Sequence, residues 1–144
     1  MSNGEASTLL PAAPCVRTPA NAPPFLEGVR CGRCGEVHIG AFRACPACCA
    51  RDSLTPHKLA EAGSLHSFSI VRRSFPGVAV PFVSAVVALD DGGFLKGNLV
   101  DVLADPAAVA GVGRVRVVLR EASVQDAKER RYMTYVFQPL DGQD

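Results

Sequence analysis

Five of the six cysteines lie close together, in the segments CGRCG (31–35) and CPACC (45–49). A CxxC step is a tight turn that presents two sulfurs to one point, and ten residues separate the two steps. Four thiolates at about 2.3 Å complete a tetrahedral zinc site. The spacing therefore predicts a structural zinc that is bound by Cys31, Cys34, Cys45 and Cys48.

The doubled cysteine leaves one choice of ligand open. Cys49 follows the second CxxC step at the position where Gly35 follows the first, so either Cys48 or Cys49 completes the set with Cys45. We favour Cys48 because it repeats the first spacing and the proline in CPAC fixes its turn. A CxxxC spacing is also compatible with zinc, and His38 is an alternative ligand in place of one cysteine.

The same four-thiolate geometry suits iron of the rubredoxin type, so iron is an alternative metal. Four protein ligands leave no open position for water or substrate, which argues against a catalytic zinc. The histidines His38, His57 and His66 lie outside any GxSxG or HExxH context, and no glycine-rich phosphate loop occurs. We therefore expect no catalytic residues in this chain.

The elements that position the cysteines divide the chain into segments. Residues 25–54 contain little apolar material apart from the cysteines, so this segment needs a metal as its core. From Gly63 onward, short β-branched and aromatic runs are separated by Gly, Pro and Asp. The expected segments are an extended Pro/Ala-rich arm (1–24), a zinc ribbon (25–54), a linker (55–62), a β domain (63–140) and a tail (141–144).

The β domain is expected to hold five strands, at residues 65–73, 81–89, 93–100, 114–122 and 131–140. Asp91-Gly92 predicts a hairpin turn after the second strand, and Asp105-Pro106 predicts the start of a short helix that ends at Gly111. This order is typical of a small Greek-key barrel of the oligonucleotide/oligosaccharide-binding (OB) type, with a five-stranded open sheet as the alternative. The predicted fold class is mainly β, with a rubredoxin-like zinc ribbon followed by a five-stranded OB-fold barrel and one short helix.

Charge and hydropathy exclude some classes of partner. The formal charge is +1 at pH 7, from 15 basic and 14 acidic residues, without the positive excess that phosphate-backbone binders carry. The chain lacks both an apolar run of about 18 residues and a secretory signal. We therefore expect a cytoplasmic protein that binds neither membrane nor nucleic acid, and in that compartment cysteines favour metal binding over disulfides.

One connection in the β domain is unusually apolar. The segment SFPGVAVPF (74–82) contains two prolines and directly follows Arg72 and Arg73. It either packs over the open end of the barrel or forms a docking surface for a protein or an acyl chain. In the second interpretation, the residues that face a partner or CoA are Arg72, Arg73, Phe75 and Phe82.

The order of several segments resembles a known family of small proteins. These segments are PPFLEGVRCGRCG (23–35), FRACPAC (42–48), AGSLHSFSIV (62–71), FPGVAVPFVSAVVALDDG (75–92) and LKGNLVDV (95–102). They resemble the zinc-ribbon plus OB-fold accessory subunits, a former domain of unknown function, that are associated with thiolase-fold and other acyl-CoA enzymes. The chain departs from that family in lacking a helical lead-in and the proline before Arg43.

The resemblance implies a non-catalytic subunit of a heteromeric thiolase-type complex, which performs thiolysis, condensation or a retro-aldol step on a CoA thioester. Degradation of an aromatic or steroid-like acid is the expected setting. The partner would carry the catalytic residues, zinc would be structural, and the CoA thioester would be a ligand of the complex. Alternatives from other classes are a single-stranded nucleic-acid-binding protein and a rubredoxin-like electron carrier.

Overall fold

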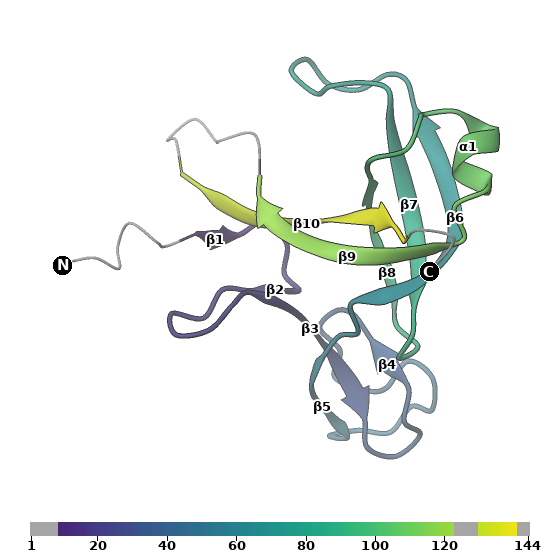
Figure 1. Ribbon diagram of the computed structural model, residues 1–144. Coiled ribbons are helices and arrows are strands. Elements are labelled where there is room, and N and C mark those ends of the chain that lie inside the picture. Colours follow the sequence, from purple (N-terminus) through teal and green to yellow (C-terminus); the bar gives the residue numbers. More distant parts are fainter. Residues whose placement is uncertain (1–8, 123–129, 141–144) are drawn as a thin grey trace. The chain divides into compact units, whose positions relative to one another are not determined.

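The computed structural model (Figure 1) describes residues 9–122 and 130–140. Residues 1–8 of the expected arm and the expected tail at 141–144 lie outside the described residues. The chain divides into two compact units, one of Met1–Leu59 with Leu119–Tyr135 and one of Ala60–Val118 with Val136–Asp144. Two strands, β9 (Arg114–Glu121) and β10 (Tyr132–Pro139), therefore contribute residues to both units.

The first unit is organised around strand β3 (Phe25–Cys31), which pairs antiparallel with β5 (Leu54–Lys58) and with β4 (Val37–His38). The strands approach closely at Gly28, where a Cβ atom would lie 2.6 Å from the carbonyl oxygen of His38. Only glycine fits this position without a shift of the backbone. Strand β3 ends at Cys31, so the sheet delivers the first cysteine to its site.

Two short strands precede β3. Strand β1 (Leu10–Pro11) runs parallel to the start of β10, and β2 (Val16–Arg17) pairs antiparallel with β3. Val16 is 1% exposed. Two short strands thus lie within the expected arm at 1–24: β1 pairs with the distant β10, and β2 pairs with β3, the next strand. Within the expected linker at 55–62, residues 55–58 belong to β5 and Ala62 begins β6.

The second unit is a closed barrel. Strands β6 (Ala62–Val71), β7 (Phe82–Leu89) and β8 (Phe94–Leu99) pair antiparallel in order, and β8 pairs parallel with β10. Strand β10 pairs with β9, and β9 pairs antiparallel with β6, which closes the barrel. This five-stranded barrel with a helix after its third strand confirms the predicted fold class.

Alternating side chains fill the barrel. Every second residue of β7 points inward, and Phe137 of β10 is completely buried in the core. Strand β6 passes so close to β7 that a Cβ atom at Gly63 would lie 2.8 Å from the Cα of Leu89 and would also clash with the carbonyl of Ala88. Strand β6 also carries a register shift between Leu65 and Ser67, which explains why its sequence alternates imperfectly.

The expected hairpin and helix are present. The Gly92 residue has φ +104° in the turn between β7 and β8, and its N–H donates to the carbonyl of Leu89 at 2.9 Å. Helix α1 (Pro106–Ala110) begins after Asp105, whose side chain accepts a hydrogen bond of 3.1 Å from the N–H of Ala108. Across residues 9–122 and 130–140, no helix is both long and apolar enough to cross a membrane.

Candidate metal centre

The first cysteine turn follows strand β3. The backbone N–H groups of Arg33 and Cys34 point at the sulfur of Cys31, with N–S distances of 3.4 and 3.5 Å. The N–H of Gly35 donates to the carbonyl of Cys31 at 2.8 Å, and Gly35 has φ +83°. Backbone amides that face a sulfur favour its thiolate form, so this turn is suited to a metal ligand.

The second turn repeats this arrangement. The N–H of Ala47 points at the sulfur of Cys45 at 3.4 Å, and the N–H of Cys49 donates to the carbonyl of Cys45 at 2.8 Å. An isolated bridge between Ala44 and Arg51 closes the turn. Cys49 has φ +66° and therefore occupies the left-handed backbone position that Gly35 occupies in the first turn.

The two turns bring four sulfurs together. The ligand atoms of Cys31, Cys34, Cys45 and Cys48 all lie within 4.8 Å of one another. The sulfurs of Cys31 and Cys48 are 3.7 Å apart, and those of Cys34 and Cys45 are 3.6 Å apart. A tetrahedron with metal–sulfur bonds of about 2.3 Å has sulfur–sulfur edges of about 3.8 Å. The four residues therefore fit a tetrahedral metal ion.

The acidity of the thiols also suits a cation. A hydrogen bond with Ser53, at 3.1 Å, and the backbone N–H of Cys34 lower the pKa of Cys31 to about 5. The pKa of Cys34 rises to about 12: the amide of Glu36 lowers it, but burial and the neighbouring sulfur of Cys45 raise it more. Ionising all four neighbouring thiols is therefore unfavourable, because the negative thiolates repel one another. A divalent cation at the centre of the four sulfurs would stabilise the thiolate forms.

His38 borders the sulfur set. Its Nε2 atom lies 3.5 Å from the sulfur of Cys45, and its ring packs edge-on against Phe42 with centroids 5.9 Å apart. The four clustered ligands are all cysteines and do not include His38. In the tautomer that carries its proton on Nε2, His38 donates a hydrogen bond to the sulfur of Cys45, and hydrogen bonds of this kind orient metal ligands.

The structure leaves Cys49 outside the four-sulfur set. Its side chain is exposed, while its backbone performs the role of the knuckle glycine. All six cysteines lie within the described residues and are free thiols. The sixth, Cys15, is buried beside Tyr135, and burial raises the pKa of its thiol. The doubled cysteine therefore supplies one sulfur of the four-sulfur set, from Cys48, and one left-handed backbone position, at Cys49.

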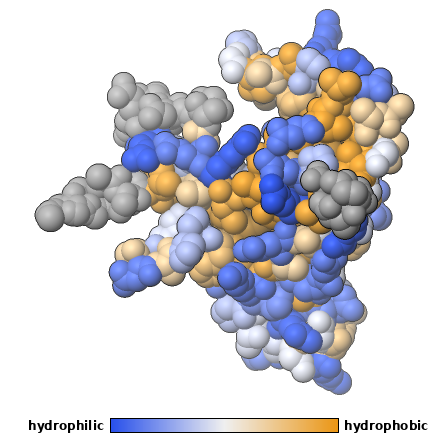
Figure 2. All heavy atoms as spheres, in the orientation of Figure 1, coloured by the Kyte–Doolittle hydropathy of each residue, from blue (hydrophilic) through white to orange (hydrophobic). Residues whose placement is uncertain are grey.

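The predicted partner-facing residues lie partly on one loop. Arg72, Arg73 and Phe75 belong to the connection between β6 and β7, whose residues 72–81 are all exposed. Phe75 is 82% exposed and does not pack over the barrel, whereas Phe82 begins β7 and is half-buried. Figure 1 shows this loop projecting beyond the barrel strands, and Figure 2 shows hydrophobic side chains exposed on it.

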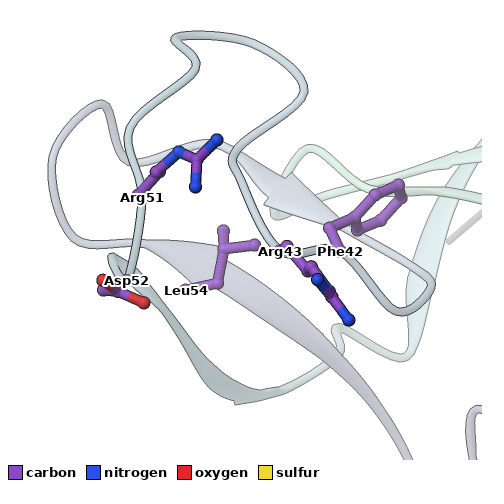
Figure 3. A pocket seen from close by; sticks show the side chains of 5 residues that line it. All are labelled: Phe42, Arg43, Arg51, Asp52 and Leu54. Carbon is purple, nitrogen blue, oxygen red and sulfur yellow. The ribbon is translucent and has the colours of Figure 1, made fainter.

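A pocket of about 310 Å³ lies beside the sulfur set (Figure 3). The sequence predicted neither this pocket nor the contact of Ser53 with Cys31, because Ser53 and the residues that line the pocket belong to no motif. The only sequence signal is a basic residue on either side of the second cysteine pair. The pocket is lined by Phe42, Arg43, Arg51, Asp52 and Leu54.

A four-cysteine ribbon joined to a barrel with the OB strand order defines a small class of mainly β proteins. Residues 57–120 match the family model described as "ChsH2, C-terminal OB-fold domain". This match covers the barrel strands β6 to β9 for most of their length, and the similar proteins below carry the DUF35 name, so the chain is similar to DUF35 proteins with an OB-fold domain.

Two known proteins are similar to this chain. One is a "DUF35 domain-containing scaffold protein" from Methanocaldococcus jannaschii, which is 33% identical over 79 residues. That alignment covers 53% of this chain and 55% of the relative, so the chain matches about half the length of this protein. The other is a chain of the solved structure of the "Ltp2-ChsH2(DUF35) aldolase", with a TM-score of 0.62 and 26% identity. That likeness covers 80% of this chain and 84% of the other.

Proposed function

We propose that this chain is a non-catalytic accessory subunit of a heteromeric acyl-CoA enzyme complex, in which a thiolase-fold enzyme is its partner and a CoA thioester is the ligand. The observation that carries the proposal is the likeness, over 80% of the chain, to a subunit of an aldolase whose name joins two components. The description of the Methanocaldococcus relative as a scaffold protein agrees with this role.

The metal centre supports an accessory role. Four thiolates saturate a tetrahedral ion and leave no position for water or a substrate carbonyl, so the metal stabilises the fold but does not activate a substrate. We propose zinc as this metal, bound by Cys31, Cys34, Cys45 and Cys48. Purified protein should be colourless and hold one zinc per chain, whereas red protein with iron would replace the proposal with electron transfer.

We propose that the loop at 72–81 docks the partner. Phe75, Val78 and Val80 expose 82%, 45% and 42% of their surfaces. Within the described part of the chain, neither Arg72 nor Arg73 has an ion-pair or hydrogen-bond partner. An apolar tip beside two unpaired guanidinium groups suits a hydrophobic cavity with an acidic rim on another protein.

The finer parts of the proposal concern the reaction. We propose thiolysis, condensation or retro-aldol cleavage of a CoA thioester during the degradation of an aromatic or steroid-like acid. The catalytic groups would belong to the thiolase-fold partner. A cytoplasmic setting is supported by six cysteines that are all free thiols.

The test is co-expression of this chain with a candidate thiolase-fold partner enzyme. The two proteins should co-elute in size-exclusion chromatography, and cleavage or condensation of a CoA thioester should require both. Phe75→Ser should weaken association, while Leu103→Ser should not, because Leu103 is 76% exposed but lies outside the loop. A partner that is equally active without this chain, and does not bind it, would contradict the proposal.

A further inference from the structure

The pocket beside the metal centre combines several kinds of side chain. Arg43 and Arg51 are cationic, Asp52 is anionic, and Phe42 and Leu54 are apolar. Figure 3 shows Leu54 between Arg51 on one side and Phe42 with Arg43 on the other. The pocket has a volume of about 310 Å³. This volume lies at the lower end of the range for small-molecule sites, which is about 300 to 1,000 Å³.

The two guanidinium groups of the pocket are exposed and have no partner within the described part of the chain. Among residues 9–122 and 130–140, the side chains of Arg43 and Arg51 have no hydrogen-bond or ion-pair partner, even though Asp52 is adjacent in sequence to Arg51. Arg114, by contrast, makes two hydrogen bonds of 2.7 and 2.9 Å to Asp90. Two unpaired guanidinium groups around an apolar floor are donors suited to the oxygens of phosphate groups.

The metal centre fixes the walls of this pocket. The ring of Phe42 lies against Gly40, where a Cβ atom would come within 3.1 Å of the ring, and against His38, which contacts Cys45. On the other wall, the hydroxyl of Ser53 lies 3.1 Å from the sulfur of Cys31. Because both walls are attached to metal-binding residues, the pocket is already formed before any ligand arrives.

We propose that this pocket binds a nucleotide. Arg43 and Arg51 bind its phosphates, Phe42 and Leu54 contact its base, and Asp52 accepts hydrogen bonds from ribose hydroxyls. Two kinds of ligand carry these phosphates, this ribose and this base: a free nucleotide and the adenosine 3′,5′-bisphosphate end of CoA. The second kind of ligand rests on the function proposed above, whereas the pocket itself does not.

The test is isothermal titration calorimetry of the full chain with its metal bound. Adenosine 3′,5′-bisphosphate should bind with a dissociation constant on the order of 10⁻⁴ M. Arg43→Gln and Arg51→Gln should each weaken binding by about tenfold, which corresponds to one charge-assisted hydrogen bond. Arg33→Gln is the matched control, because Arg33 is an exposed arginine of the same ribbon outside the pocket, and it should leave binding unchanged.

Two further measurements make the outcome specific. Phe42→Ala should weaken the bisphosphate about threefold but leave pyrophosphate unaffected, since only the former has a base to stack. Metal content verifies the fold of each variant, and Arg51→Lys, which keeps the charge but loses the planar fork, replaces Arg51→Gln if that variant loses metal. Loss of binding with Arg51→Lys then supports the proposal in the same way.

Comparison of the affinities of CoA and ADP shows whether the pocket binds the nucleotide end of CoA or a free nucleotide. Tighter binding of CoA than of ADP points to the nucleotide end of CoA, and equal binding points to a free nucleotide. Absence of bisphosphate binding at millimolar concentration would overturn the proposal, as would a loss in Arg33→Gln equal to that in Arg51→Gln. Co-elution of the pocket variants with the thiolase-fold partner is scored separately, so failure here is distinct from failure of the accessory role.

Discussion

Replacement of Cys49 by glycine should stabilise the metal centre. Cys49 has φ +66°, and the equivalent residue of the first turn is Gly35 with φ +83°. A residue with a Cβ atom pays about 1 to 2 kcal/mol in this conformation. Glycine avoids that cost, and the exposed side chain of Cys49 contributes little packing that its removal would lose.

The greater conformational entropy of glycine in the unfolded state offsets part of the stabilisation expected for Cys49→Gly. Glycine has more conformational freedom to lose on folding, which costs about 0.5 to 1 kcal/mol. The net effect of Cys49→Gly is therefore a stabilisation of about 0.5 kcal/mol. Cys49→Ala keeps the backbone cost and should leave stability close to that of the wild type. Cys48→Ser removes a ligand and should unfold the ribbon, whose buried core consists of Cys31, Cys45 and Ala50.

The measurement is metal release into a chromogenic chelator at increasing urea. Cys49→Gly should release its metal at a midpoint about 0.3 M higher in urea, Cys49→Ala at the wild-type midpoint, and Cys48→Ser without urea. If Cys49→Gly instead loses metal as readily as Cys48→Ser, the fourth ligand is Cys49 and the CxxxC alternative holds. Equal midpoints for the glycine and alanine variants would refute the reasoning from backbone strain.

Three other changes test the rest of the fold. Gly63→Ala places a Cβ atom against the carbonyl of Ala88 and should cost about 3 kcal/mol in barrel stability, measured by urea unfolding followed by circular dichroism. Asp105→Ala removes the N-cap of α1 and should cost about 1 kcal/mol in the same assay. Burial and the thiol of Cys15 raise the pKa of Tyr135 to about 12. Its neutral form therefore adds stability below about pH 10 that is lost as pH rises toward about 12, and Tyr135→Phe should show a smaller loss of urea midpoint across that window.

Local sequence signals predicted most of the metal centre and the barrel. The two CxxC steps, the Asp91-Gly92 turn and the Asp105-Pro106 helix start each depend on interactions within about five residues, so one stretch of sequence carries the whole signal. The start of β6 was predicted less accurately, because the strand begins at Ala62 rather than Leu65. Ala62 and Gly63 are of residue types that are depleted in strands, so they gave no local signal.

Tertiary pairing could not be predicted in the same way. Strands β1 and β2 contain two residues each, too few for a periodic pattern, and β1 exists because it pairs with Tyr132 and Met133 at the far end of the chain. The pocket on the ribbon has the same origin. Phe42 and Leu54 meet only because β5 returns along β3 and the second turn folds back between them.

The metal centre and the pocket beside it are tested by different changes to the protein. Metal removal should abolish the pocket, because His38 and Ser53 connect its walls to Cys45 and Cys31. The reverse does not follow, since Arg43 and Arg51 are exposed and contact none of the four sulfurs. Variants of these arginines therefore separate ligand binding from folding, whereas cysteine variants change both together. Binding measured on metal-loaded protein is accordingly the assay that reports on the role of the ribbon.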